Sequence, residues 1–294
     1  MGQHKKRIFI IVSIVLAFVL FYTSVSFGGR TADIEFGHWV NTRNENRLNF
    51  LVLGTDKEET RTDLILLCQY NEKSNKLSVM QIPRDTRVEN KRSDKKINSA
   101  YGSKNGIKTL KNEVEEITGI YPENYFVINF EGFRQLIDAI GGVEFNVPID
   151  MKYTDPVQDL VIDIDKGYQT LDGEKAEMFM RFRQNNDHSG YAEGDIGRLK
   201  AHKSFYRATI DKLLSFNGIY NIGEIIDVAK DNVKTDFTVS DLFRYMGDIK
   251  KLNENSVEIV MLPGNGKYIS QDGNMVSFYI ADTNELKKLK DKYF

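Results

Sequence analysis

Two aspartates, Asp56 and Asp63, flank a short polar loop between two apolar runs of the sequence. Asp56 lies just after the run LNFLVL (residues 48–53), and Asp63 opens the run DLILLCQY (residues 63–70). Because side chains at strand ends point into a common crevice, we expect the two carboxylates to face each other across the loop. Two carboxylates so placed suit Mg²⁺, which keeps most of its waters and usually bridges to substrate phosphates. Acids of an ordinary solvated turn have the same spacing, so the sequence leaves both interpretations open.

Arginines also gather at the ends of predicted elements. Arg84 lies just after the run KLSVMQI (residues 76–82), and it should emerge beside the two aspartates if this run pairs with the preceding one. In Arg181-Phe182-Arg183, alternation places both arginines on one side of an extended segment and the phenylalanine on the other. Each arginine alone is typical of a surface. Together with the aspartates they indicate a phosphate-rich ligand, because the guanidinium fork matches phosphate oxygens.

A further acidic and basic pair, Asp195 and Arg198, opens a long predicted helix in the segment GDIGR. An aspartate at a helix start is expected for capping alone, whereas Arg198, one turn into the helix, has no such role. We therefore count Arg198 among the anion-binding candidates and keep both interpretations of Asp195.

The sequence lacks the common catalytic signatures GxGxxG, GxxxxGK[ST], HExxH and GxSxG. Its four histidines, His202 among them, have no metal-ligand spacing, which disfavours a histidine-centred mechanism. The single cysteine, Cys68, excludes an intrachain disulfide and a Cys-rich zinc site. Residues 264–267 (GNGK) follow a predicted strand and a proline, and we interpret them as a tight turn.

The composition also limits the class of protein. Of the 294 residues, 41% are hydrophobic and 28% are charged, which excludes a disordered or collagen-like polymer. The formal net charge of −2 gives no general electrostatic reason to bind DNA or RNA, so we expect no nucleic-acid partner.

The first structural feature along the chain is a candidate membrane helix. Residues 8–27 carry no charge and follow a basic cluster at residues 5–7 (KKR). A helix of this length, at about 1.5 Å per residue, crosses a hydrocarbon core of roughly 30 Å. The positive-inside rule keeps residues 1–7 in the cytoplasm and places the rest of the chain outside the cell membrane. A cleavable signal peptide is the alternative, since residues 24–26 (SVS) resemble a cleavage site, although a signal core normally spans only roughly 7–15 residues.

Behind a polar linker at residues 28–46, the sequence predicts one α/β domain over residues 47–294. Short apolar runs indicate strands, and apolar residues at helical spacing indicate helices. The predicted strands cover residues 48–53, 63–70, 76–82, 125–130, 143–147, 160–164 and 256–262. The predicted helices cover residues 106–118, 131–140 and 282–293, with three further helical stretches between 172 and 250 interrupted by a polar loop at 184–194. Strands mixed with helices indicate a layered α/β sheet, partly antiparallel.

A series of motifs resembles the LytR-CpsA-Psr family of cell-envelope proteins over residues 47–205. They are, in order, NFLVLGTD, RTDLILL, VMQIPRDTRV, KINSAYG, the IDAIGGVE block, LDGEKAEMFMRFR and GDIGR. The resemblance implies one N-terminal transmembrane helix, a location at the cell membrane, and an extracytoplasmic three-layer α/β/α domain with a mixed central sheet.

The same resemblance implies an enzymatic function. Family members transfer an anionic glycopolymer, such as wall teichoic acid or capsular polysaccharide, from an undecaprenyl-pyrophosphate carrier to peptidoglycan. The product is a phosphodiester to a muramic acid hydroxyl, and the reaction depends on Mg²⁺. The prenyl chain lies in a hydrophobic tunnel of the domain.

The resemblance also implies roles for individual residues. Asp56 and Asp63 match the acidic pair assigned to Mg²⁺ and acid–base work, and Asp195 is a second candidate base for the accepting hydroxyl. Arg84 and Arg183 complete the catalytic candidates. The expected pyrophosphate-binding side chains are Arg61, Arg84, Arg181, Arg183, Arg198 and His202. Apolar residues that could line the tunnel, although an ordinary core explains each of them, are Phe126, Ile128, Phe130, Phe133, Leu136 and Ile137.

This chain departs from the family pattern in three places. The loop KEETRT between the two acids (residues 57–62) is shorter, so their separation can differ. The stretch between RFR and GDIGR (residues 184–194) is longer, which should reshape the acceptor side. Ala201-His202 stands where the family shows an Arg-Gln pair. His202 either replaces the glutamine as a hydrogen-bond donor or is a partly exposed helix histidine.

Two other functions remain open at this stage. A pyrophosphate hydrolase that releases the glycopolymer to water could use the same arginines and Mg²⁺. A polyprenyl-pyrophosphate-binding or regulatory envelope protein is the second, since relatives are often labelled transcriptional attenuators. No basic helix-turn-helix face in the sequence supports binding to DNA.

Overall fold

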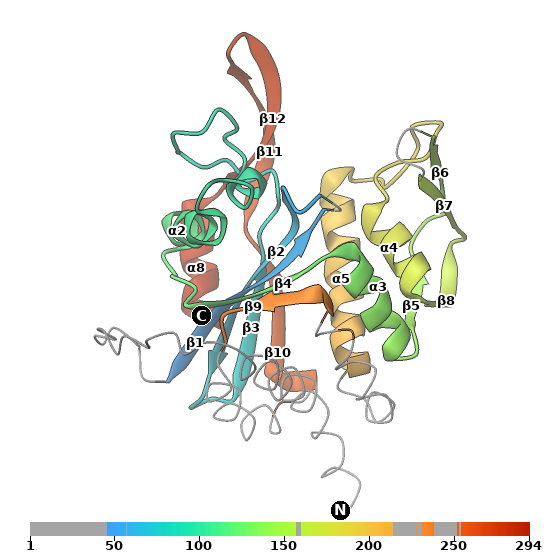
Figure 1. Cartoon of the computed structure of the whole chain (residues 1–294), viewed down its shortest axis with the longest axis horizontal. Helices are drawn as coiled ribbons and strands as arrows, with labels where there is room; N and C mark the ends of the chain where they lie inside the picture. The colour runs from blue at the N-terminus through green and yellow to red at the C-terminus, as the bar shows by residue number, and fades with distance from the viewer. Residues whose placement is uncertain are drawn as a thin grey trace, which may run out of the picture.

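The computed structural model describes residues 46–294 apart from 57, 157–159, 214–227, 229–230, 238–251 and 253. A six-stranded sheet lies at its centre (Figure 1). In spatial order the strands are β10 (Val257–Met261), β3 (Lys76–Gln81), β2 (Thr62–Asn71), β1 (Arg47–Thr55), β4 (Asn124–Ile128) and β9 (Val233–Thr235).

The central sheet is mixed. β1 runs parallel to β4, and β3 runs parallel to β10, whereas β2 is antiparallel to both β1 and β3. The hairpin predicted between the second and third apolar runs is confirmed, with Cys68 opposite Val79. β1, β3, β4 and β10 therefore point the same way, and their carboxyl ends meet at one edge of the sheet (the carboxyl edge). Ligands of open α/β sheets bind in the crevice outside such an edge.

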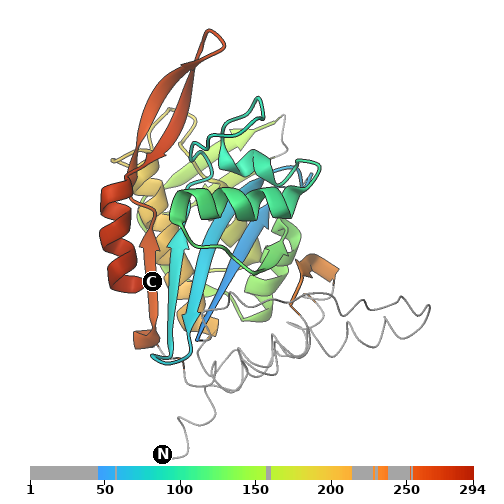
Figure 2. The ribbon, with the colours of Figure 1, turned by 90° about the vertical axis from the view of Figure 1, so that its left-hand side faces the viewer.

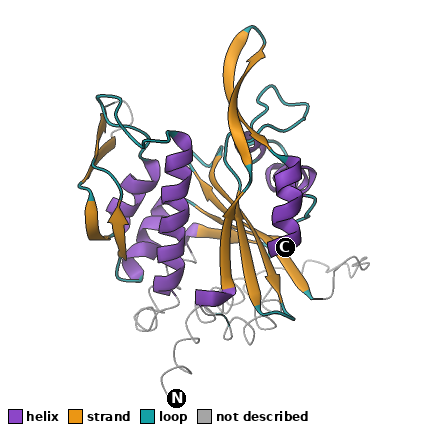
Figure 3. Cartoon of the chain, turned by 180° about the vertical axis from the view of Figure 1, so that it is seen from behind, coloured by secondary structure: helices purple, strands orange, loops and turns teal. Residues whose placement is uncertain are grey.

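Helices cover both faces of the sheet (Figure 3). They are α2 (Gly106–Thr118) and α8 (Thr283–Tyr293) on one face and α5 (Asp195–Leu213) on the other. Alternation along β1 and β2 divides the apolar residues between the faces. Leu51 and Leu53 are buried in the cluster beneath α2 and α8, whereas Cys68 is buried with Tyr206 of α5. The expected mixed sheet flanked by helices is confirmed.

A second hydrophobic cluster forms around α5, α3 (Phe130–Ala139) and α4 (Gly173–Arg181). Two small antiparallel sheets complete it, β5 (Val143–Val147) with β8 (Gly167–Leu171) and β6 (Met151–Asp155) with β7 (Leu160–Ile164). The rings of Phe145, Phe179 and Phe205 pack at its centre, with centroids between 5.0 and 5.3 Å apart. α5 joins the two clusters, because Phe205 faces this one and Tyr206 faces the sheet.

Local capping explains the limits of α3 and α4. The side chain of Asn129 accepts a hydrogen bond from the amide of Gly132 at 2.8 Å, and Asp172 caps α4 in the same way. Gly141, with φ +78°, adopts the left-handed conformation that ends α3. The helix predicted over residues 131–140 is therefore confirmed to within one residue at each end.

A hairpin of β11 (Gly264–Gln271) and β12 (Asn274–Ala281) projects from the body of the molecule (Figure 2). The interpretation of residues 264–267 as a tight turn is wrong, because they begin β11. The turn lies at the tip instead, where Asp272 and Gly273 both have positive φ. Most of β11 is exposed, so the strand lacks the apolar alternation by which a sequence indicates a strand.

Part of the predicted organisation lies outside the described residues. This applies to the membrane span at residues 8–27, to the linker up to residue 45, and to most of the stretch of residues 214–250 that holds the third predicted helix. Among the residues that are described, no helix combines the length and apolarity needed to cross a membrane.

Candidate functional site

The two predicted acids lie at the loop end of the β1–β2 hairpin, on the carboxyl edge. Gly54 pairs with Leu64 and Thr55 pairs with Thr62, so Asp63 is an extra residue between two strand pairs. Such a β-bulge bends the strand and re-aims the side chain of the extra residue, and bulges are common next to active sites. The bulge thus removes Asp63 from the regular alternation of β2.

The carboxylate of Asp56 organises the loop between the two strands. Its Oδ1 accepts hydrogen bonds from the backbone amides of Thr60 (2.8 Å) and Arg61 (3.2 Å), and its Oδ2 accepts one from the Thr60 hydroxyl (3.0 Å). Gly102 supports the same loop from outside, since a Cβ at this glycine would lie 2.4 Å from the carbonyl oxygen of Thr60. The position of Asp56 therefore depends on a close backbone approach that only glycine allows.

Arg84 forms an ion pair with Asp63 that connects the end of β3 to the bulge of β2. The chain turns directly after β3, where the Thr86 hydroxyl donates a hydrogen bond to the carbonyl of Pro83 at 2.6 Å. The side chains of Arg84 and Asp63 remain 31% and 32% exposed. The expectation that Arg84 emerges beside the acids is confirmed, and a ligand can reach the guanidinium group from solvent.

Arg198 and His202 lie one turn apart on α5. His202 is buried, and its Nε2 has no hydrogen-bond partner among the described residues. Burial, followed by the positive charges of Arg198 and Arg84, lowers the pKa of His202 to about 3. The imidazole is therefore neutral near pH 7. The interpretation of His202 as a partly exposed residue is therefore wrong, and Arg84 and Arg198 both lie near enough to its ring to lower its pKa.

Arg181 and Arg183 lie in different environments. Arg181 ends α4, forms an ion pair with Glu177 at 2.9 Å and lies 5.7 Å from the ring centre of Phe130. Phe182 turns inward and is fully buried, and Arg183 is exposed in the loop that follows. The predicted extended segment is wrong at Arg181, which belongs to α4. The charge of Arg181 is thus partly balanced by an acid that the sequence motifs did not indicate.

The structure does not test the site roles expected for Asp195 and Arg61. α5 begins at Asp195, as the sequence predicted, but the side chain of this residue lies outside what the structure describes. Arg61 is exposed in the loop that Asp56 organises. The roles expected for both residues stay predictions.

Thr55 and Thr62 were not among the predicted site residues, although each directly precedes one of the two acids in the sequence. They form the last pair of the hairpin and are fully buried, and neither hydroxyl has a hydrogen-bond partner among the described residues. Buried polar groups in proteins are normally hydrogen-bonded, so an internal water would complete the bonding of these hydroxyls. The repeated Thr-Asp in GTD and RTD is the sequence signal that could have identified them.

The carboxyl edge offers few protein ligands to a metal ion. Within the described part of the chain, no group of three or more His, Cys, Asp or Glu side chains could hold one. Asp56 and Asp63 supply two carboxylates. Mg²⁺ is commonly bound through one or two carboxylates, with waters and substrate phosphates completing its shell. In this structure Asp56 is bonded to its own loop and Asp63 to Arg84, so the expectation that the two carboxylates face each other around an ion stays a prediction.

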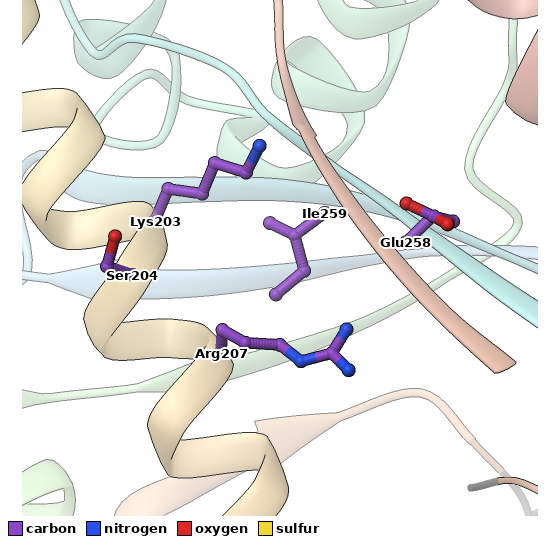
Figure 4. A pocket seen from close by; sticks show the side chains of 5 residues that line it. All are labelled: Lys203, Ser204, Arg207, Glu258 and Ile259. Atoms are coloured by element: carbon purple, nitrogen blue, oxygen red, sulfur yellow. The ribbon is translucent and has the colours of Figure 1, made fainter. Parts of the chain in front are cut away.

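A separate hollow of about 380 Å³ lies between α5 and the edge strand β10 (Figure 4). Its lining residues are Lys203, Ser204, Arg207, Glu258 and Ile259. Arg207 donates a hydrogen bond to the carbonyl of Val257 at 2.6 Å, and Lys203 reaches towards the same strand. This hollow lies along the side of the sheet, whereas Asp63 and Arg84 lie at its carboxyl edge, so we leave it out of the candidate site.

Fold and site together define a class of protein: an α/β domain whose carboxyl edge presents aspartates and arginines suited to a phosphorylated ligand. The sequence model of the LytR_cpsA_psr family matches residues 23–294, and the chain belongs to this family. The resemblance drawn from the motifs is thereby confirmed.

Individual relatives agree with this placement. The chain is 31% identical over 252 residues to the polyisoprenyl-teichoic acid–peptidoglycan teichoic acid transferase TagU of Bacillus mycoides (strain KBAB4), covering 82% of this chain and 78% of the relative. The crystal structure of TagV from B. subtilis superposes with a TM-score of 0.67 at 26% identity, covering 84% of this chain and 96% of TagV. A protein of Enterococcus faecalis described as a transcriptional regulator superposes with a TM-score of 0.66 at 26% identity, covering 85% and 87%.

Proposed function

We propose that this chain transfers an anionic glycopolymer of the teichoic acid kind from an undecaprenyl-pyrophosphate carrier to peptidoglycan. The ion pair of Arg84 with Asp63 at the carboxyl edge, with Arg198 and His202 beside it, carries the proposal. Guanidinium groups match a pyrophosphate in both charge and geometry. The names of the relatives TagU and TagV, which are teichoic acid transferases acting on peptidoglycan, support the choice of substrates.

The proposed reaction is a phosphoryl transfer. A muramic acid hydroxyl oxygen attacks the phosphorus atom that carries the glycopolymer, and a new P–O bond forms. The bond between that phosphorus and the bridging oxygen breaks, and undecaprenyl phosphate leaves with the electron pair. A carboxylate accepts the hydroxyl proton, and the candidates are Asp56, Asp63 and Asp195.

The basic side chains support this step through electrostatics. Arg84, Arg183 and Arg198 stabilise the negative charge that develops on the leaving phosphate, with Arg181 and Arg61 as further pyrophosphate contacts. His202, the remaining pyrophosphate-binding candidate, is neutral near pH 7 and buried beside Arg84 and Arg198, so it adds no charge to the site.

Mg²⁺ belongs to the same proposal. Asp56 and Asp63 are the side chains that would hold it, in keeping with their position on one hairpin end. When bound, the ion would offset part of the pyrophosphate charge, as it does in phosphoryl transfer generally.

The membrane location is also proposed. Residues 8–27 would anchor the chain in the cell membrane, with the domain outside, so that a membrane-borne lipid carrier is within reach. Of the six apolar residues expected to line the prenyl tunnel, Ile137 is fully buried and the other five are half-buried. Half-buried apolar side chains on β4 and α3 suit a surface that a prenyl chain would cover.

The test of the proposed function uses the full-length chain in detergent micelles. It is incubated with a short synthetic glycan on polyprenyl pyrophosphate, Mg²⁺ and peptidoglycan oligomers, and the products are followed by mass spectrometry. A phosphodiester-linked glycan with released polyprenyl phosphate is the expected result.

Two other outcomes would contradict the proposal. Free glycan phosphate that forms equally with and without peptidoglycan would identify a hydrolase. Tight lipid binding without any product would identify a carrier or regulatory protein.

A reporter fused after Phe294 that is active only in the cytoplasm would overturn the proposed topology.

A further inference from the structure

A groove of about 450 Å³ lies between β6, β7 and the loop that follows Arg183, outside the site described above. Its lining residues are Lys152, Tyr153, Thr154, Val161, Ile162, Asp163, Asn185, Asn186 and Asp187. The loop part lies in the stretch of residues 184–194, which the sequence analysis expected to reshape the acceptor side.

Two asparagine side chains build the loop onto the edge of β6. Asn186 accepts a hydrogen bond from the Thr154 amide at 2.8 Å and donates one to the Thr154 carbonyl at 3.2 Å. Asn185 accepts one from the Lys152 amide at 2.6 Å and donates one to the Asp150 carbonyl at 3.3 Å. The two side chains thus bond to backbone groups of β6 that a neighbouring strand would otherwise pair with. The groove is therefore formed before any ligand arrives, which lowers the entropic cost of binding.

The groove is tied to the expected pyrophosphate site through the backbone. Asn185 lies two residues after Arg183, and a chain spans at most about 3.6 Å per residue, so their Cα atoms lie within roughly 7 Å. Gln184 and Gly190 form a β-bridge that closes the loop, and a Cβ at Gly190 would lie 3.3 Å from the Arg183 carbonyl oxygen. The groove therefore adjoins Arg183 along the chain.

The floor of the groove combines an exposed apolar side chain with several polar groups. Val161 pairs with Thr154 across the β6–β7 hairpin and is 56% exposed, which is unusual for so apolar a side chain. Lys152 pairs with Asp163 across the same hairpin and forms ion pairs with Asp163 and Asp165. A sugar has the matching surface, because its ring presents an apolar C–H face edged by hydroxyl groups that both donate and accept hydrogen bonds.

Charge distinguishes between the two sugar polymers of the reaction. Asp163 and Asp187 line the groove against one lysine, Lys152, whose charge the neighbouring carboxylates already balance. A phosphate-rich polymer would be repelled here, whereas an uncharged sugar chain would not.

We propose that this groove binds the uncharged amino-sugar backbone of the acceptor and so holds the accepting strand next to the pyrophosphate site. The identification of the acceptor as a peptidoglycan strand rests on the proposed function. The groove and its preference for uncharged sugar over polyanion rest on the contacts above.

The test compares Val161→Lys with a matched control, Tyr168→Lys, in the full-length chain. Tyr168 is 74% exposed on β8 and lines no part of the groove, so both changes place a lysine at an exposed apolar position. Binding of an N-acetylglucosamine tetrasaccharide is measured by calorimetry. Val161→Lys should weaken it about tenfold or more, and Tyr168→Lys should leave it unchanged. In the transfer reaction, Val161→Lys should raise KM for peptidoglycan oligomers and leave KM for the lipid donor unchanged.

Each result has a definite meaning. If the wild type transfers glycan and Val161→Lys behaves like Tyr168→Lys, the assignment of the groove is wrong and the proposed function is unaffected. Wild-type protein that binds the tetrasaccharide at the groove without catalysing transfer would retain the groove and reject the function. If the wild type does not bind the tetrasaccharide, the assignment of the groove is wrong. The assignment is also wrong if the wild type binds a teichoic acid fragment more tightly than the tetrasaccharide and Val161→Lys alters that binding.

Discussion

Arg84 and Asp63 form an ion pair between the turn after β3 and the bulge of β2. The pair exists because the bulge takes Asp63 out of the regular alternation of its strand. It holds a guanidinium group and a carboxylate at the carboxyl edge, where both remain partly open to solvent. Because the ion pair is partly exposed, we expect it to matter for transfer activity and to contribute little to the free energy of unfolding.

Removal of the guanidinium group should therefore affect activity far more than folding. Arg84→Ala is expected to reduce transfer about 100- to 1,000-fold, the usual loss when one group that stabilises developing charge is deleted. The free energy of unfolding should change by only about 1 kcal/mol or less, because ion pairs this exposed contribute little. Single-turnover transfer and urea unfolding of the same preparations measure the two effects.

Arg183→Ala should behave like Arg84→Ala, since Arg183 is exposed and its loss leaves the core intact. Arg47→Ala is the matched control, because Arg47 is a half-buried arginine that begins β1, at the end of the sheet away from the acids. If Arg84→Ala and Arg183→Ala both retain the activity of Arg47→Ala, the assignment of these arginines to pyrophosphate is wrong.

Asp63→Ala should shift the dependence on Mg²⁺ to higher concentration, because one of the two carboxylates available to the ion is lost. The measurement is a titration of transfer activity with MgCl₂. Asp291→Ala, at an exposed position of α8, controls for the loss of one negative charge. An unchanged titration curve for Asp63→Ala would count against its role as a metal ligand.

Gly102 supports the loop of Asp56 and is not itself one of the candidate site residues. Gly102→Ala would place a Cβ 2.4 Å from the backbone oxygen of Thr60, so the loop must move. We expect a loss of about 1–3 kcal/mol in unfolding free energy, as in other overpacked sites, together with reduced transfer. Gly266→Ala is the control, since nothing lies within 4 Å of a Cβ at that glycine. Equal stability and activity of the two variants would show that the loop tolerates displacement.

His202 should make the folded protein sensitive to acid. Its pKa is about 3 in the folded chain against 6.5 as the ordinary value, so between these values the unfolded chain binds the proton more readily. The contribution of neutral His202 to the free energy of unfolding is therefore fully present above pH 6.5, and it is lost as the pH falls towards 3.

The corresponding experiment compares wild type with His202→Gln, which removes the titrating group and retains a polar side chain. Between pH 7 and pH 5, the wild type should lose about 2 kcal/mol more unfolding free energy than the variant. Urea unfolding at the two pH values measures the difference, and carboxylates that titrate in both proteins cancel. Parallel losses in the two proteins would mean that His202 is accessible to protons in the folded state.

The sequence by itself determined the elements whose residues interact locally. The helix predicted over residues 106–118 has those limits in the structure, because its apolar spacing and the following Gly119 define both its face and its end. The hairpin of β2 with β3 was predictable from two apolar runs and a polar turn. The positions of Asp56 and Arg84 at strand ends followed from the same runs.

Tertiary structure alone decided how those residues meet. The bulge at Asp63, the burial of His202 near Arg198 and Arg84, and the ion pair of Arg181 with Glu177 all depend on which elements lie side by side. The exposed strand β11 was missed because no apolar periodicity marks a strand that buries little of either face. Local periodicity reports which face of an element is buried, whereas the partner it is buried against is set by packing between segments distant in the sequence.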